Sequence, residues 1–269
     1  MRDTRSVPEP HPREVAIQRI RDLLILDGNL VIASDSVGGI GPKPADTVPA
    51  TAQTVAHFAL RVPLLEVICS GAQPIAVIND LCVELEPTGR QMIKEILRLA
   101  TEAGINPDAV TGSTEDNVVT RATGVGVTVL GRTPTEGLLS GRARAGDIVL
   151  CAGLPLSAPH DDVRIGHPSQ VTVAAISAAV ASGLVHDALP VGSKGIAREV
   201  GQLADSAGLD YGWLDPGEVS LSASGGPASC VLLSCDPGCV EAVTMLLGPS
   251  TPVHVIAQFS ASERAGERA

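Results

Sequence analysis

An apolar strand that runs directly into a carboxylate, three glycines and a lysine most constrains how this chain can fold. Residues 31–46 read VIASDSVGGIGPKPAD, which predicts a strand that ends at Asp35-Ser36. The residues that follow it include Gly38, Gly39, Gly41 and Lys43. Glycines let backbone N–H groups approach a ligand closely, and the lysine adds a compact positive charge. The segment therefore suits a phosphate with a magnesium ion, and an ordinary Gly/Pro loop is the alternative interpretation.

The composition is that of a well-packed protein with room for two modest domains. The chain has 269 residues, of which 44% are hydrophobic and 18% are charged. Its formal net charge of −11 argues against a nucleic-acid partner or an anionic membrane surface, since both attract clusters of Lys and Arg. An acidic protein that binds phosphate must do so locally, through magnesium and backbone amides.

The same sequence gives no indication of export or of a membrane span. The first residues lack an apolar core, and the longest apolar stretch, residues 171–185, is interrupted by serine, threonine and glycine. We therefore expect a cytoplasmic protein whose six cysteines are reduced thiols. Cys230 and Cys235 lie five residues apart on an expected strand, so they should point to opposite faces and cannot share a metal ion.

Hydrophobic periodicity predicts an α+β protein with two halves of antiparallel, hairpin-like strand pairs. In the first half we expect strands at 22–26, 29–34, 74–80, 109–111 and 124–130, and helices at 51–70 and 87–103. In the second half we expect strands at 146–153, around Cys230 and at 252–259, and helices at 168–182, 193–207 and 237–247. These elements predict two domains, at 20–132 and 144–259, joined by a linker at 133–143. A flexible arm at 1–19 precedes them, and a disordered tail at 260–269 follows them.

The strands of the first half carry more apolar positions than one covered sheet face requires. This excess occurs at 29–34, 75–78 and 124–130. A second face that is also buried would need a partner, which predicts a homodimer through the first half.

Several polar residues are candidates for a binding site. Glu66 shares a helical face with Phe58 and Val62, so its carboxylate should face the interior, either as a ligand for magnesium or nucleotide or in a salt bridge with Arg61. In TGSTEDN, residues 111–117, the side chains of Thr114, Glu115 and Asn117 offer oxygen ligands, and a solvated turn or a helix cap made by Ser113 or Thr114 is the alternative.

Two further segments have simpler interpretations. Lys194 precedes an expected helix, where either it contacts a phosphate or the neighbouring Ser193 caps the helix. His160, Asp161, Asp162 and His167 have the composition of a metal site, but no regular element aims them at one point, so we expect them at the surface.

Read in order, five segments resemble one enzyme superfamily. They are ASDSVGGIGPKPAD, RVPLLEVICSGAQPIAV, TGSTEDN, GVGVTVLGR and ARAGDIVLCAGLP. They are similar to segments of aminoimidazole ribonucleotide (AIR) synthetase, thiamine-monophosphate kinase, selenophosphate synthetase and the hydrogenase maturation protein HypE, over about residues 20–259. The passage ending in SGAQP is the most specific of them. The resemblance implies a first domain that pairs with its twin as a dimeric β-barrel, and a second domain that forms an α+β sandwich over the substrate.

The resemblance also implies roles for individual residues around ATP and Mg²⁺. The metal candidates are Asp35, Glu66, Asn79 and Glu115. The candidate nucleotide contacts are Asp22, Ser36, Gly38, Gly39, Gly41, Lys43, Gly112, Ser113, Thr114, Asn117 and Lys194. Asp35, Lys43 and Glu66 would be catalytic. Glu66 stands where the superfamily has aspartate, and Ser113 replaces an acid, so that Glu115 or Asp116 would supply that ligand.

Within the superfamily, ASDSVGGIG, NDLCVELEPTG and TGSTEDN are similar to the branch of α-ribazole kinases. The Gly-Glu-Asp-Tyr motif of thiamine-monophosphate kinases is missing, and LSASGGPAS occupies that region. This resemblance implies an ATP- and Mg²⁺-dependent kinase that phosphorylates the 5′-hydroxyl of α-ribazole in cobalamin nucleotide-loop salvage. The alternatives are another ATP-dependent enzyme of the superfamily, or a nucleotide-binding maturation protein without turnover.

Overall fold

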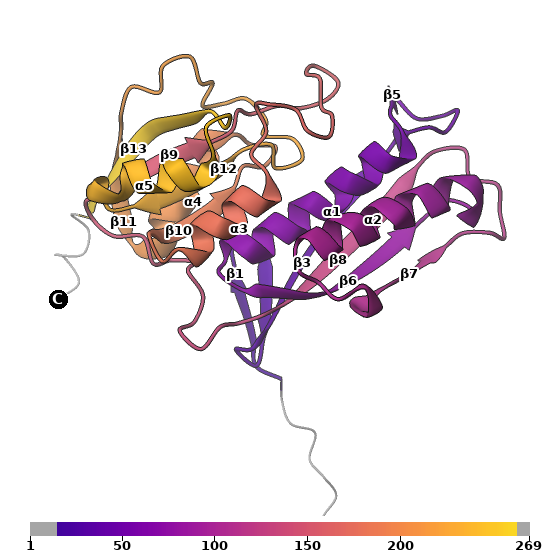
Figure 1. The fold of residues 1–269 in the computed structure, drawn as a ribbon. Coiled ribbons are helices and arrows are strands. Elements are labelled where there is room, and N and C mark those ends of the chain that lie inside the picture. Colours follow the sequence, from indigo (N-terminus) through magenta and orange to yellow (C-terminus); the bar gives the residue numbers. More distant parts are fainter. Residues whose placement is uncertain (1–14, 263–269) are drawn as a thin grey trace, which may run out of the picture.

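Two β-sheets flank one long helix in the computed structural model, which describes residues 15–262 (Figure 1). The long helix is α1 (Ala52–Cys69), and it follows the first strands of the chain. Residues 1–14 of the predicted arm (1–19) and residues 263–269 of the predicted tail (260–269) lie outside the described residues.

The first sheet has six strands in the order β1-β2-β3-β8-β6-β7. They are β1 (Ile17–Ile20), β2 (Leu23–Leu26), β3 (Leu30–Gly38), β6 (Gln73–Leu81), β7 (Val110–Thr114) and β8 (Gly124–Arg132). Along β8, Val125, Val127 and Val129 are buried in the core with α1, and the residues between them are half-buried. This alternation is the pattern of a sheet whose one face is covered, here by α1 and α2 (Arg90–Glu102) (Figure 1).

Short elements complete the first half. A parallel pair, β4 (Ile40–Gly41) and β5 (Val48–Pro49), encloses the glycine-rich loop. A π-helical turn at Leu85–Gly89 precedes α2, and a 3-10 turn at Pro107–Ala109 precedes β7.

The second sheet is antiparallel and has five strands in the order β10-β12-β9-β13-β11. The strands are β9 (Ile148–Ala152), β10 (Val185–Pro190), β11 (Leu209–Trp213), β12 (Val231–Cys235) and β13 (Val253–Ala261), and the helices are α3 (Val173–Ala181), α4 (Ile196–Ala207) and α5 (Val240–Leu247), the last after a 3-10 turn at Pro237–Cys239. Along β9, Val149 and Cys151 pack with α4, whereas Leu150 and Ala152 pack with α3 and α5. The central strand is therefore apolar on both faces, because helices cover both faces of the sheet.

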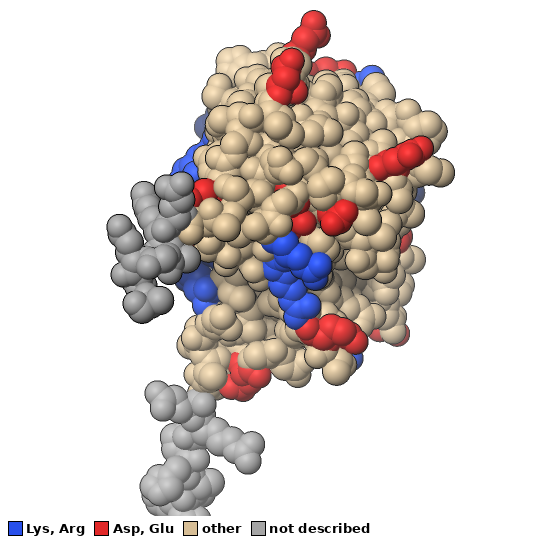
Figure 2. Space-filling model, turned by 90° about the vertical axis from the view of Figure 1, so that its left-hand side faces the viewer, with Lys and Arg blue, Asp and Glu red and all other residues tan. Residues whose placement is uncertain are grey.

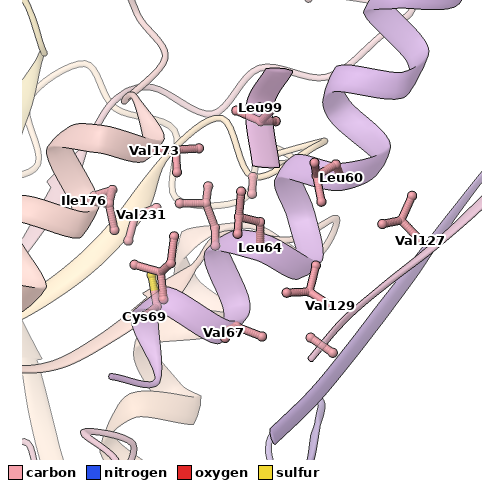
Figure 3. Packing of buried hydrophobic residues seen from close by; sticks show 14 of the residues in the cluster. Leu60, Leu64, Val67, Cys69, Leu99, Val127, Val129, Val173, Ile176 and Val231 are labelled. Carbon is pink, nitrogen blue, oxygen red and sulfur yellow. The ribbon is translucent and has the colours of Figure 1, made fainter. Parts of the chain in front are cut away.

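Helix α1 joins the two halves through one continuous hydrophobic core. Thr51 caps its N-terminus, where the Oγ1 accepts a hydrogen bond from the Thr54 N–H at 3.1 Å. Leu60 and Leu64 lie between Val127 and Val129 of the first sheet and Val173, Ile176 and Val231 of the second half (Figure 3). The helix is long and apolar enough to cross a membrane, but 78% of its most apolar window is buried in this core.

Two arginines add polar connections between the halves. Arg21, in the β1–β2 turn, forms a bidentate ion pair with Asp187 of β10, with Nη1–Oδ1 and Nη2–Oδ2 distances of 3.0 and 2.5 Å. Asp187 is fully buried and also accepts from the Gly141 N–H at 2.8 Å. Arg61 of α1 donates to the carbonyl oxygens of Val171 and Ala228. These contacts fix the hairpin and α1 against the second half.

Several predictions on local structure are confirmed. Helices α1 and α2 lie within the predicted ranges, and Pro63 is inside α1. The buried thiols of Cys230 and Cys235 belong to opposite faces of the second sheet. The segment from His160 to His167 is a surface loop, in which Asp162 pairs with Arg164.

Other local predictions are wrong. Strand β1 overlaps the predicted arm at residues 17–19 and pairs with β2, and β13 extends two residues into the predicted disordered tail, where it pairs with β11. Strand β3 continues past Asp35 to Gly38, because Ser36 and Gly38 pair with glycines of β8. The first half of TGSTEDN is strand rather than turn. Strands β6 and β7 are parallel with α2 as their crossover, which is a βαβ unit and not a hairpin.

The first sheet is open within one chain, so the structure contains no closed barrel among its described strands. Its uncovered face carries a row of four apolar side chains that are neighbours across β2, β3, β8 and β6. These side chains are half-buried and belong to Leu24, Ile32, Leu130 and Ala76. On another face of the molecule, Lys and Arg occur in small groups beside Asp and Glu rather than as one continuous basic patch (Figure 2).

Candidate functional site

A small pocket lies where the two halves meet beside the C-terminal end of α1. Its walls come from Arg21 and Asp22 of the β1–β2 turn, from Val62 and Glu66 of α1, and from the second half. The second half supplies residues 188–192, Glu199, Gly226 and Ala228. The pocket encloses about 70 Å³, and ligand sites are typically on the order of 300–1,000 Å³. A nucleotide would therefore enter only if the β1–β2 hairpin moved away from the second half, which would break the Arg21–Asp187 ion pair.

Glu66 is the most perturbed acid of this pocket. Burial raises its pKa to about 8, and the nearby charges of Asp22, Asp35 and Glu199 act in the same direction. Its carboxylate makes no hydrogen bond or ion pair with any residue in the described part of the chain. The predicted alternative of a salt bridge with Arg61 is wrong, because Arg61 donates to backbone carbonyls. With a pKa of about 8, Glu66 is largely protonated at neutral pH, and its ionised form would lack a compensating charge within the described part of the protein.

Asp35 belongs to the same charge cluster. It lies on the face of β3 that packs against α1, and burial raises its pKa. Strand register places it opposite Val127, which in turn pairs with Asn79 of β6. Asp35 and Asn79 therefore project from the same face of the sheet in one lateral row.

Gly112 continues this row and makes room for Asn79. A Cβ at Gly112 would lie 2.0 Å from the Asn79 carbonyl oxygen and 2.6 Å from its Oδ1. The Asn79 Nδ2 donates to the Thr111 carbonyl at 2.9 Å, which orients the amide. Gly112 thus acts through packing, and the Nδ2 contact leaves the Asn79 Oδ1 available as an acceptor.

The glycine-rich loop is held by its own hydrogen bonds. The Gly39 N–H donates to the Thr123 carbonyl at 2.9 Å, and Gly38 is part of β3. Asp46 accepts from the Lys43 N–H at 2.8 Å and from the N–H and hydroxyl of Thr123 at 2.7 Å. A Cβ at Gly41 would lie 2.3 Å from the Thr123 hydroxyl, so this glycine permits the close contact. In this conformation Asp46, which sequence reasoning missed, organises the loop.

Lys43 lies at the opposite end of α1 from Glu66. It lines an open hollow of about 660 Å³ with Thr51 and Ala52. Ala52 and Glu66 are fourteen residues apart on α1, which corresponds to about 21 Å at ~1.5 Å per residue. The Lys43 side chain pairs with Glu84, and this hydrogen bond is the main cause that lowers the pKa of Glu84 to about 2. Within one chain, Lys43 and Glu66 therefore cannot contact the same phosphate group.

Like Asp35 and Asn79, the remaining predicted contacts are not among the residues that line the pocket. Ser36 and Ser113 are on the uncovered face of the first sheet, opposite to Asp35. Glu115 accepts from the Asn117 N–H at 2.9 Å, and Thr114 donates to Asp116 at 3.0 Å. Lys194 is exposed in the turn before α4, whose N-cap is Gly195. The structure thus brings together Asp22, Asp35 and Glu66, and it adds Glu199 of α4, which no motif in the sequence indicates.

The acids suit magnesium in kind, because carboxylate and amide oxygens are its preferred protein ligands. Among residues 15–262, no three His, Cys, Asp or Glu side chains converge closely enough to hold a metal ion alone. Magnesium commonly takes only one or two carboxylates and completes its shell with water and substrate phosphates. The cluster fits that use, in which a nucleotide supplies the missing oxygens.

The mixed α+β fold resembles that of AIR-synthetase-related proteins. A HypE structure from a HypE–HypF complex superposes with a TM-score of 0.66 at 14% identity, over 90% of this chain and 87% of that chain. Thiamine-monophosphate kinase from Stenotrophomonas maltophilia gives 0.62 at 15% identity, over 93% and 90%. HypE in complex with ATP gives 0.64 at 16% identity, over 88% and 78%. Neither a protein-family model nor a curated protein sequence matches the chain.

Replacing Glu66 with glutamine should reveal the raised pKa of Glu66 as a pH-dependent difference in the free energy of unfolding. A carboxyl whose folded pKa is about 8, against 4.5 in its ordinary state, stabilises the fold fully below pH 4.5 and loses that contribution as the pH rises through 8. One pKa unit corresponds to about 1.4 kcal/mol, and the pKa rises from 4.5 to about 8, so at pH 8.5 without metal we expect Glu66→Gln to be more stable than the wild type by on the order of 5 kcal/mol.

Urea unfolding from pH 4.5 to 8.5 measures this difference, which should shrink toward the acid end. Glu241→Gln, at an exposed position of α5, is the matched control and should follow the wild type. A constant gap between Glu66→Gln and the wild type across the range would contradict the assignment.

Proposed function

We propose that the chain is an ATP- and Mg²⁺-dependent kinase of a small hydroxylated molecule, and that its site is the pocket beside Glu66. The observation that carries the proposal is the buried carboxyl of Glu66, which lines the pocket without a partner among the described residues and lies near Asp22, Asp35 and Glu199. Ionised carboxylates that lie close together and are partly buried lower the stability of a folded protein, and a bound divalent cation removes this repulsion. Perturbed acids in a pocket between domains are also typical of functional sites.

In this proposal the acids of the first half hold the metal. Asp35 and Glu66 would supply carboxylate oxygens, Asp22 lies near Glu66 as a further ligand or as a contact to bound water, and Asn79 lies two strands from Asp35 on the same face of the sheet. Held there, magnesium would supply neutralisation of the negative charge that develops during transfer. We assign no direct role in this step to Lys43 of the same chain, since its distance from Glu66 along α1 is too great.

The reaction is an in-line transfer of one phosphoryl group. The hydroxyl oxygen of the substrate forms a bond to the γ-phosphorus of ATP, the bond from that phosphorus to the bridging oxygen of ADP breaks, and the hydroxyl proton is lost to solvent or to a nearby carboxylate. The protein contributes by positioning the two reactants and by stabilising charge, with little covalent participation.

We propose α-ribazole as the substrate on the basis of the three segments ASDSVGGIG, NDLCVELEPTG and TGSTEDN. The pocket walls include Leu23, Val62, Leu189 and Val191. Aliphatic walls of this kind suit an apolar dimethylbenzimidazole ring once the pocket opens. The relatives in the comparison include a thiamine-monophosphate kinase and PurL of Thermotoga maritima complexed with AMPPCP, which supports nucleotide use by this fold.

Purified protein should convert α-ribazole to its 5′-phosphate and form one ADP for each product. It should act poorly on thiamine monophosphate and on formylglycinamidine ribonucleotide. Mass spectrometry of the three reactions, with ADP measured in parallel, separates the possibilities. Phosphorylation of a competitor with α-ribazole untouched would refute this substrate, and the absence of any ADP above a protein-free blank would favour a maturation protein without turnover.

The same assay tests the site with Asp35→Asn. Removal of a metal-binding carboxylate should lower kcat/KM at least about 100-fold, by analogy with the loss of one transition-state contact. Asp108→Asn, at an exposed position between α2 and β7, is the control and should keep wild-type activity. Equal activity of Asp35→Asn and the wild type would move the metal site elsewhere.

We also propose a homodimer through the uncovered face of the first sheet. The row of Leu24, Ile32, Leu130 and Ala76 remains half-exposed in one chain, and a second copy would bury it. Light scattering should give about twice 27.5 kDa for the wild type. Ile32→Lys should give a monomer, whereas Val255→Lys, on the second sheet, should stay dimeric. A monomeric wild type would contradict this interface.

A further inference from the structure

A further cavity, with several polar side chains in its wall, lies on the other side of α1 from the pocket beside Glu66. It encloses about 310 Å³ between α1, α2 and the segment that leads into α3. His57 and Glu66 are nine residues apart on α1, and at about 100° per residue nine residues place them on opposite sides of the helix. The cavity is therefore separate from the proposed kinase site.

The cavity contains a buried arginine without an acidic partner. Arg61 is 3% exposed, and within the described chain its Nε and Nη2 donate to carbonyl oxygens of Val171 and Ala228 at 2.5–3.1 Å. None of these hydrogen bonds uses Nη1. No carboxylate among residues 15–262 pairs with this guanidinium, and burial lowers its pKa to about 10. A buried cation in this situation favours a bound anion.

A second donor in the wall is also unsatisfied. Gln170 is 8% exposed, and its Nε2 has no hydrogen-bond partner among the described residues. A buried amide donor that makes no hydrogen bond costs about 1–3 kcal/mol. Its neighbour Thr172 is the N-cap of α3, so the positive end of a nine-residue helix also borders the cavity.

The other polar side chains of the wall are already ordered. The His167 Nδ1 accepts from the Ser169 N–H at 3.1 Å, which leaves the Nε2–H of a neutral ring as a donor. The His57 Nδ1 lies 2.9 Å from the Glu95 carboxylate. Arg98 is paired with Glu95 and Glu102, so the acids of this wall are compensated while Arg61 is not.

We propose that this cavity is a binding site for a phosphate group, either inorganic phosphate or the phosphate of a small ester, held by Arg61, Gln170 and the N-terminus of α3. Planar guanidinium donors, amide donors and helix N-termini are the usual partners of phosphate. The volume equals that of roughly ten water molecules, which leaves room for a few carbon atoms beside the phosphate. The proposal is independent of the kinase reaction.

The site has a direct connection to the pocket beside Glu66. The Ala228 carbonyl that Arg61 binds belongs to a residue that lines that pocket and has a positive φ of 53°. A ligand that draws the guanidinium toward the cavity would therefore act on the wall of the other pocket. Phosphate occupancy should thus alter nucleotide affinity, and the effect should be reciprocal.

Imidazole proton signals offer a local test. The chain has six histidines, and two of them, His57 and His167, line the cavity. In a titration with inorganic phosphate at constant ionic strength, signals of these two should move with saturation at low millimolar concentration, while those of His186 and His254 stay in place. A parallel titration with glycerol 3-phosphate separates the two sources, since tighter binding of the ester would identify a phosphorylated metabolite as the ligand.

Gln170→Leu is the decisive variant, because it removes one donor while keeping the approximate size of the side chain. Without phosphate its Tm should equal or exceed that of the wild type, and its apparent phosphate affinity should fall at least tenfold. Lys94→Gln, at an exposed position of α2, is the matched control and should bind as the wild type does. Asp35→Asn should also retain the response, which separates this site from the nucleotide site.

Two results would overturn the proposal. One is the absence of any saturable movement of the His57 and His167 signals up to about 50 mM of either compound, a concentration far above the ~1 mM dissociation constant of a weak specific complex. The other is an identical response in Gln170→Leu and the wild type.

Discussion

The burial of α1 between two sheets is the constraint on which the rest of the structure depends. One side of the helix packs on valines of β8, and the other packs on α3 and β12 (Figure 3). Because both sides are apolar and close-packed, the two halves cannot rotate about the helix without opening the core. The Arg21–Asp187 ion pair and the hydrogen bonds of Arg61 fix the same arrangement with polar contacts. Glu66 is consequently held at the junction, where water has limited access.

The acids of this protein divide into two groups by their partners. Glu84 is paired with Lys43, Glu95 with Arg98 and His57, and Asp187 with Arg21, so each has a structural explanation. Glu66 has no such partner among the described residues and lies near three other carboxylates. Repulsion between neighbouring carboxylates does not stabilise the fold, so the cluster indicates a bound ligand that is not part of the chain.

The sequence predicts regular elements well where local periodicity decides them. Helices α1 and α2 and the strands β9, β12 and β13 of the second sheet follow from their apolar patterns. The predicted end of β3 is wrong because Gly38 and Gly124 pair across strands, and that pairing depends on a segment far along the chain. The parallel pairing of β6 and β7 has the same origin, since pairing direction depends on where α2 packs.

The site is predictable only in part, for similar reasons. Asp35 and Glu66 stand out in the sequence as acids within apolar segments. Glu199 approaches them from the second half, and Glu84 reaches Lys43 from 41 residues away, so neither can be inferred from spacing. Lys43 is close to Asp35 in sequence, which suggests one shared site, whereas the loop carries it to the other end of α1.

Anomalous diffraction from crystals grown with AMPPCP and Mn²⁺, which replaces Mg²⁺, tests the central claim most directly. The account predicts a manganese peak bound to the carboxylate of Glu66 or Asp35 and to phosphate oxygens of the nucleotide, at the junction of the two halves. Manganese and nucleotide bound in the hollow beside Lys43, with the Glu66 cluster free of metal, would contradict it.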